Sequence, residues 1–227
     1  MTERLTISVV GHSAINREPE RAILKVSVSQ TANDQTSASR DVVQTAKAIQ
    51  DMLATLTPKE PSGEATADAP VTHWSMSSMS TSSRHDRENN ERTFVARTSF
   101  SVKFRDFNKL SAVASELSVM PNVSVSSVEW KLTDATVASL ATESRTSAVH
   151  DALAKAQDYA KAFGYEKVEP REVSDSGYGL PSTQTASAMR SKKIPGVAGR
   201  TEESHELEFH PEAVSLNCCV HATFHAV

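Results

Sequence analysis

The chain has 227 residues, enough for one large domain with a substantial hydrophobic core or for two small domains. Its composition, 38% hydrophobic and 23% charged, is that of a globular protein. The formal net charge of -4 gives no global electrostatic reason to expect nucleic acid or an anionic membrane as a partner.

Targeting features are missing from the N-terminal stretch. Its first apolar run breaks at Gly11 and His12, so it lacks the apolar region of a secretion signal. No apolar run approaches the ~20 residues needed to span a bilayer. Cys218 and Cys219 are adjacent, and adjacent strand residues point to opposite faces, so no disulfide joins them. We therefore expect a cytoplasmic protein, with nuclear entry left open.

The first elements are two strands and a helix. Alternating apolar and polar residues predict strands over residues 5–10 and 22–31, joined as a hairpin with a long connection. Apolar residues at helical spacing predict a helix over residues 37–56, which Pro58 ends. The segment 58–70 has no periodicity and predicts a flexible loop.

The middle of the chain predicts two strands, a second helix and a further strand. A weak strand is expected over 71–83 and a stronger one over 92–104, with a polar, flexible tip over 84–92 between them. Asp106 is placed to cap a helix that ends before Pro121. The alternation that follows predicts a strand over residues 123–133.

A long helix dominates the second half of the chain. It is expected over residues 136–163, with Asp134 as its cap and Gly164 after its end. Alanine on the buried stripe would let this helix lie close against a sheet. The expected stripe consists of Ala148, Ala152, Ala156, Tyr159 or Ala160, and Phe163.

Two strands remain after the long helix. One is expected over 167–177, with Pro170 at an edge or a bulge, and the last over 213–224. Between them, residues 176–206 are rich in Ser, Thr, Gly and Pro and predict a flexible loop. The order β-β-α-β-β-α-β-α-β-β predicts an α+β fold, a mainly antiparallel sheet with helices on one face, in a single domain of residues 1–227.

Several pieces of this pattern occur together in one known family. In chain order they are Val9-Val10-Gly11-His12 with Pro19 to Ala22, Phe94 to Ala96 with Phe100 and Val102, Val128 to Asp134, the helix positions Ala148, Asp151, Ala152, Lys155, Ala156, Tyr159, Ala160 and Gly164, and Pro211-Glu212. Their order and spacing resemble the SIMPL domain family, named for a signalling protein that associates with a pelle-like kinase and related to bacterial periplasmic antigens.

The resemblance implies an α+β domain, a tendency to self-associate, and protein interaction in the kinase-associated members. It supplies no catalytic residues and no cofactor. Bacterial members carry a secretion signal that is not recognised here, so a periplasmic role does not transfer. The loops at 58–70 and 176–206 are longer than the family core requires.

The closing strand carries the weak candidates for a metal site, Cys219, His221 and His225, which share one face with Thr223. Cys219 and His221 could supply two zinc ligands, but a closed site needs four, and His225 is too far along the strand without a bend. Further ligands would come from His205, His210 or another strand. The alternative is a half-solvated polar face on an ordinary closing strand, which the pattern favours, so no metal is expected.

A basic strip is the other candidate site. Arg190, Lys192, Lys193 and Arg200 lie in a stretch with no acidic residue between Ser176 and Thr201, and could dock an acidic partner or be switched by phosphorylation. Composition favours a plain solvated loop. Catalytic motifs, including the Gly-x-Ser-x-Gly elbow, the phosphate loop and His-Glu-x-x-His, do not occur.

Two functions follow as hypotheses. The first is a non-catalytic intracellular protein-interaction or self-assembling domain, with signalling as one setting, and a protein partner or a second copy as its ligand. The second is a metal- or small-ligand-binding protein, or an enzyme, that uses the polar residues of the last strand.

Overall fold

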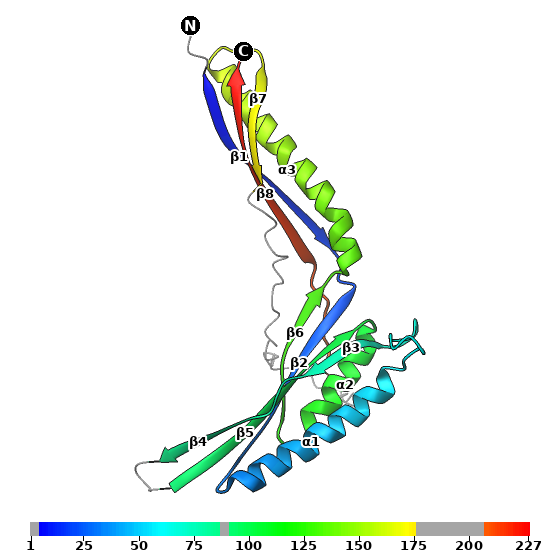
Figure 1. Ribbon diagram of the computed structural model, residues 1–227. Helices are drawn as coiled ribbons and strands as arrows, with labels where there is room; N and C mark the ends of the chain where they lie inside the picture. Colours follow the sequence, from blue (N-terminus) through cyan, green and yellow to red (C-terminus); the bar gives the residue numbers. More distant parts are fainter. Residues whose placement is uncertain (1–4, 87–90, 176–206) are drawn as a thin grey trace, which may run out of the picture. The chain divides into compact units, whose positions relative to one another are not determined.

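The computed structural model describes residues 5–86, 91–175 and 207–227, and these form two compact units (Figure 1). The α3 unit contains residues 5–19, 132–175 and 212–227, and the α1–α2 unit contains residues 20–86, 91–131 and 207–211. Each unit has its own antiparallel sheet. The single domain over residues 1–227 stays a prediction, because two compact units can still fold as one domain.

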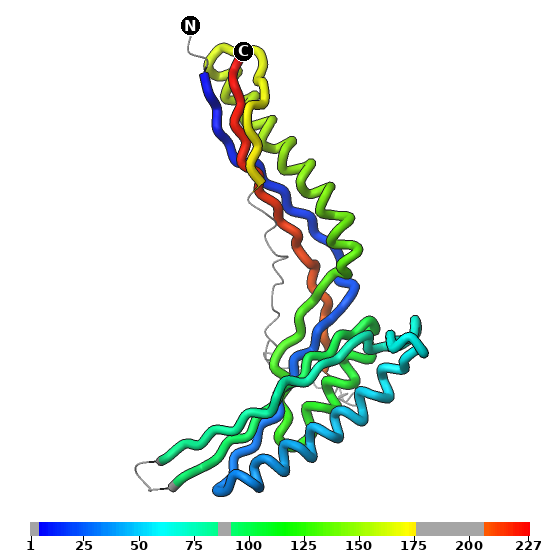
Figure 2. The backbone as a smooth tube through the Cα atoms, viewed as in Figure 1, coloured from blue at the N-terminus to red at the C-terminus, as the bar shows by residue number. Residues whose placement is uncertain are grey.

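The α3 unit is a three-stranded sheet with one helix. Its strands follow the order β1-β8-β7, with bounds β1 (Thr6–Arg17), β8 (Val214–Ala226) and β7 (Val168–Asp175). The helix α3 (Asp134–Ala162) packs on β1 and β8 and runs beside them along its length (Figure 2). All pairs in this sheet are antiparallel.

Small residues bring α3 close to this sheet. The buried positions of the helix, four residues apart, are Leu140, Ser144, Ala148, Ala152, Ala156 and Ala160. The predicted alanine stripe is therefore confirmed at Ala148, Ala152, Ala156 and Ala160. The prediction is wrong at Phe163, which is 68% exposed, and Tyr159, the alternative to Ala160, is 56% exposed. Where Ser144 interrupts the apolar stripe, its hydroxyl forms a buried hydrogen bond with that of Ser13.

The α1–α2 unit is a five-stranded sheet with two helices. Four strands follow the order β3-β5-β2-β6, and β4 also pairs with β5. The strand bounds are β2 (Arg21–Ala32), β3 (Val71–Met76), β4 (Ser80–Asp86), β5 (Glu91–Phe104) and β6 (Val123–Lys131), and the helices are α1 (Gln35–Leu56) and α2 (Phe107–Val119). The α+β class with antiparallel sheets is thus confirmed.

Both helices cover the same face of the five-stranded sheet. Its buried side chains alternate along the strands, as at Leu24 and Val26 on β2 and Phe100 and Val102 on β5. The register places these residues on one face. The predicted cap Asp106 is confirmed, because its carboxylate accepts hydrogen bonds from two backbone N–H groups of α2.

The predicted cap of α3 is wrong by one residue. Thr133 is the N-cap, and its hydroxyl accepts a hydrogen bond from the backbone N–H of Thr136, while Asp134 lies in the first turn. There its negative charge still interacts favourably with the positive end of the helix dipole.

The predicted hairpin of the first two strands is also wrong. β1 pairs along its whole length with β8 at the other end of the chain, whereas β2 pairs with β5 and β6. The alternation of a strand fixes which side chains share a face, but it does not identify the neighbouring strand.

Over the described residues the structure contains one strand more than predicted, in the order β-β-α-β-β-β-α-β-α-β-β. The stretch expected as one strand over 71–83 is interrupted at Ser77, and its two parts, β3 and β4, pair with successive parts of β5. At the break, the hydroxyl of Ser77 accepts from the backbone N–H of Ser99, and the hydroxyl of Thr98 donates to the carbonyl of Ser77. These side-chain contacts separate the two ladders.

The remaining predicted elements differ mainly at their ends. β7 lies at the edge of its sheet and its register with β8 shifts at Pro170, so the prediction of an edge or a bulge at this residue is confirmed. The expected loop 84–92 is shorter than predicted, because β4 continues to Asp86 and β5 already begins at Glu91. The expected loop 58–70 contains a β-bridge between Lys59 and Ala65. The expected loop 176–206 lies outside the described residues.

Candidate functional site

The closing strand β8 has two chemically different faces. Cys218, Val220, Ala222 and Phe224 are buried against α3, as their alternation predicts. The residues between them point to the opposite face, which α3 does not cover. Cys219 and His225 are half-buried there, and His221 is exposed. The three weak metal candidates therefore do share one face.

The register with β1 places a third histidine beside these residues. His12 lies directly opposite Cys219, Val10 opposite His221, and Thr6 opposite His225. Sequence reasoning missed His12, although it allowed for a ligand from a different strand. The signal that could have found it is the pairing of β1 with β8, which the sequence alone did not reveal.

This arrangement brings together two possible metal ligands, His12 and Cys219, and not the four ligands of a closed zinc site. Over residues 5–86, 91–175 and 207–227, no three His, Cys, Asp or Glu side chains lie close enough together to hold a metal ion. The imidazole of His225 approaches the hydroxyl of Thr6 at 3.4 Å. His210 lies 4.0 Å from the carboxylate of Glu208, with both side chains exposed. His205 lies outside the described residues.

The central part of this surface carries no formal charge. We call it the neutral face; it consists of Thr6, Ser8, Val10 and His12 from β1 and Asn217, Cys219, His221, Thr223 and His225 from β8. The hydroxyls of Ser8 and Thr223 are hydrogen-bonded across the two strands at 3.2 Å. A shallow depression of about 270 Å³ lies at its β7 margin, bordered by Ser8 and His221 and by the charged Glu172 of β7.

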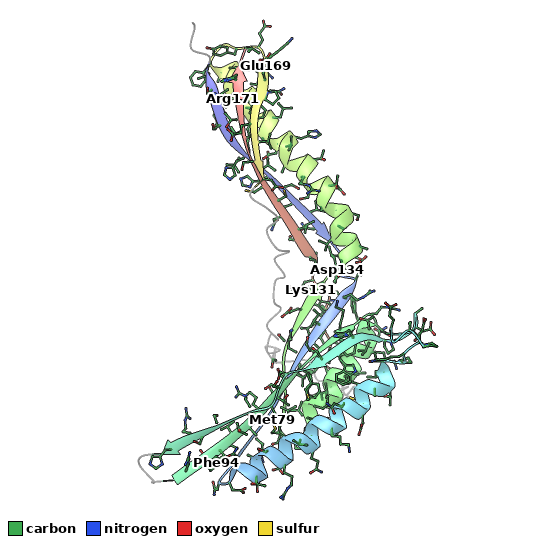
Figure 3. The ribbon with its side chains drawn as sticks, in the orientation of Figure 1. Met79, Phe94, Lys131, Asp134, Glu169 and Arg171 are labelled. Atoms are coloured by element: carbon green, nitrogen blue, oxygen red, sulfur yellow. The ribbon has the colours of Figure 1, made fainter. Side chains whose placement is uncertain are left out.

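Charged residues lie at the two edges of this sheet instead. At the β1 edge, the carboxylate of Asp151 accepts from the backbone N–H of His12 at 2.7 Å, and the ammonium of Lys155 donates to the carbonyl of Val10 at 2.9 Å. These contacts occupy edge groups that could otherwise pair with another strand. The outer strand β7 carries Glu169 and Arg171, both labelled in Figure 3.

The Asp151 contact predicts a pH-dependent contribution to stability. The hydrogen bond from Lys155, and then that from the backbone of His12, hold the pKa of Asp151 below its ordinary value. Because the pKa is lower in the folded state, the stabilisation is present above the ordinary carboxyl pKa and is lost as the pH falls through the folded pKa. Asp151→Asn is therefore expected to lower the urea midpoint at pH 7, by an amount that disappears in acid.

Urea titrations at pH values from 7 down into the acid range check the expectation. Asp158→Asn, on the same helix but exposed, is the matched control and should change the midpoint little at any pH. A deficit of Asp151→Asn that persists unchanged in acid would show that the charge of Asp151 is not involved.

The two cysteines predict a difference in reactivity. Burial raises the pKa of the Cys218 thiol, which is only 3% exposed. Because the thiolate is the reactive form, Cys218 should be alkylated slowly. Iodoacetamide is expected to label Cys219 on the neutral face about tenfold faster, and Cys219→Ser should remove the fast phase. Peptide mapping checks the site, and equal labelling of Cys218 and Cys219 would contradict this prediction.

A second uncovered surface lies on the five-stranded sheet, opposite α1 and α2. We call it the cationic face, from Arg21, Lys25, Arg84, Arg97, Lys103 and Lys131. Short hydroxyl side chains lie among these cations, namely Ser27, Ser29, Thr31, Ser75, Ser80, Ser82, Thr93, Ser99 and Ser101. Sequence reasoning missed this surface, because the cations come from four strands.

The basic strip predicted as a partner site, Arg190, Lys192, Lys193 and Arg200, lies outside the described residues. In the helices that the structure describes, none is both long and apolar enough to cross a bilayer.

Comparison with models of protein families gives a match over nearly the whole chain. The model of the SIMPL family, described as a protein of unknown function (DUF541), matches residues 7–224. No curated protein matches the chain. The family match covers both units, including β1 and most of β8. The chain therefore belongs to the SIMPL family.

Proposed function

We propose that this chain is a non-catalytic, cytoplasmic protein-interaction domain that self-assembles through the neutral face of its α3 unit, with signalling as one setting. The observation that carries the proposal is the composition of that face. It combines exposed and half-buried hydroxyl, imidazole and thiol groups with no Lys, Arg, Asp or Glu on the facing positions of β1 and β8.

Charge is what separates this face from an ordinary solvated sheet surface. Antiparallel sheets commonly leave one polar face in water. When two copies meet through the same patch, however, a charge at the two-fold axis faces a like charge and is repelled, and every other charge needs an opposite charge at the symmetry-related position. A face without formal charge avoids this repulsion and can pack against itself.

The area of the sheet is sufficient for a weak assembly. Strands of 12 and 13 residues span about 40 Å at ~3.3 Å per residue, and three strands span about 14 Å. With the shorter β7, whose Glu169 and Glu172 lie at the margin of the contact, the whole sheet face offers about 500 Å² per copy, so a two-copy contact buries about 1,000 Å² in total, near the lower limit for specific interfaces. We therefore expect an oligomer that depends on protein concentration.

Light scattering coupled to size exclusion, over a concentration series of the full chain, tests this proposal. His221→Lys places a charge in the middle of the neutral face and should shift the protein toward the monomer. His150→Lys makes the same change on the exposed side of α3 and should leave the oligomer intact. A monomer at every concentration, or an oligomer that both variants retain, would contradict assembly through this face.

A metal- or small-ligand-binding protein, or an enzyme, is the second candidate. The observation that favours it is the register that places His12 opposite Cys219 and near His221. Imidazole and thiolate are suitable ligands for zinc, and further ligands would have to be recruited. Elemental analysis of the same fractions tests it. One equivalent of zinc that is lost in Cys219→Ser would support this candidate, and metal-free protein would remove it.

A further inference from the structure

We propose that the cationic face of the α1–α2 unit is the docking site for an acidic, extended segment of a protein partner. This inference rests on the proposed function as a protein-interaction domain and specifies the chemistry of the partner. It concerns a different surface from the neutral face, so the two can be tested separately.

Charge on this face is opposite to that of the whole chain. The chain has a formal net charge of -4, yet six cations lie on the cationic face. The strands carry three acids on this side, namely Glu129, which lies 3.7 Å from Lys131, and Asp86 and Glu91, which are register partners at the ends of β4 and β5. Lys131 is labelled in Figure 3, at the end of β6. Such segregated positive charge attracts an anionic partner.

Four of the cations are available to a partner. Lys25, Arg84, Arg97 and Lys103 take part in none of the salt bridges formed between described residues. The ammonium of Lys25 donates to the hydroxyl of Ser101 at 3.2 Å, a neutral group that a carboxylate could replace. Unpaired cations at an interface gain more from an acidic partner than cations that must first break an existing pair.

Hydroxyl groups and shallow depressions continue between these cations. One depression of about 300 Å³ is bordered by Lys25, Ser75 and Ser101, and another of about 490 Å³ by Arg84 and Arg97. Serine and threonine hydroxyls can donate hydrogen bonds to carboxylates. From Thr93 to Ser101 on β5, the two depressions follow about 26 Å of strand at ~3.3 Å per residue. An extended segment of about eight residues matches this length.

The side chains on this face favour a protein partner over other polyanions. Single-stranded nucleic acid is usually bound on aromatic side chains that stack with the bases. The aromatic residues of the five-stranded sheet that the structure describes, including Phe94, Phe100 and Trp130, lie on the side of α1 and α2. Ile23 and Val95 are the larger apolar residues on the cationic face, too few to insert into a bilayer.

Fluorescence anisotropy with the full chain tests the inference. The probe is a labelled peptide that alternates Glu and Thr, and its matched control alternates Gln and Thr. The acidic peptide should bind and the neutral one should not. Arg97→Glu should weaken binding by about tenfold, and raised salt should also weaken it, because the contacts are between exposed charges. Lys47→Glu, an exposed charge reversal on α1, should bind like the wild type.

Three results would overturn the inference. They are no binding of the acidic peptide, equal binding by Arg97→Glu and wild type, or tighter binding of a thymidine oligonucleotide or of phosphatidylserine vesicles than of the peptide. If any of these occurs while His221→Lys still dissociates the oligomer, the inference about the partner fails and self-assembly stands. If the acidic peptide binds as expected but the protein is a monomer at every concentration, the inference about the partner stands and self-assembly fails.

Discussion

Gly11→Ala is expected to destabilise the α3 unit by about 3 kcal/mol, the upper part of the range for overpacking. A Cβ atom at this position would lie 2.0 Å from the carbonyl oxygen of Ala148 and 2.8 Å from the Cβ of Ala152. These atoms belong to the backbone and to the shortest side chain, so neither can move away without moving α3. Relief would require the helix to shift from β1 and expose part of the alanine stripe.

Hydrogen exchange measured by mass spectrometry, together with urea unfolding followed by circular dichroism, checks this expectation. Exchange should rise in β1, β8 and α3. His12→Ala is the matched control, since it changes the next residue of the same strand on the uncovered face, and it should alter stability by only about 0.5 kcal/mol. If Gly11→Ala were as stable as His12→Ala, the close approach of α3 to β1 would be incorrect.

Phe100→Ala is expected to destabilise the α1–α2 unit by about 4 kcal/mol. Phe100 is almost fully buried at the centre of β5, and its ring lies 6.5 Å from that of Trp74 between centroids. Removing a buried aromatic ring loses its transfer free energy and leaves a cavity, which together cost about 3 to 5 kcal/mol.

Tryptophan fluorescence during urea unfolding reports this loss directly. The two tryptophans of the chain, Trp74 and Trp130, both belong to the α1–α2 unit. Ser29→Ala, on the cationic face of neighbouring β2, is the control and should cost about 0.5 kcal/mol or less. A Phe100→Ala midpoint close to that of the control would mean that α1 and α2 pack on the other face of the sheet.

Local patterns in the sequence predicted most of the features that depend on residues close in sequence, namely strand faces, the buried stripe of a helix, and a helix cap. Alternation identified the buried and uncovered sides of β8, because strand periodicity assigns each side chain to a face. Helical spacing identified the alanine stripe of α3, and Asp106 was recognised as a cap. The position of Pro170 at an edge or a bulge was predicted because proline cannot donate to a ladder.

Features that depend on distant partners could not be predicted in this way. The pairing of β1 with β8 joins residues 197 to 219 positions apart, and it alone brings His12 to Cys219. The cationic face likewise needs the registers of four strands before its cations come together. Ser77 interrupts a strand through contacts with β5 that its neighbours in sequence do not reveal.

The rate of Cys219 alkylation, measured as a function of protein concentration, tests most directly whether the neutral face is the surface of self-assembly. Cys219 lies on that face and Cys218 is buried, so the fast-reacting thiol reports whether the face is covered. We expect labelling of Cys219 to slow as the wild type assembles, and to stay fast at every concentration in His221→Lys. A labelling rate that does not change with concentration, while light scattering shows an oligomer, would mean that another surface holds the copies together.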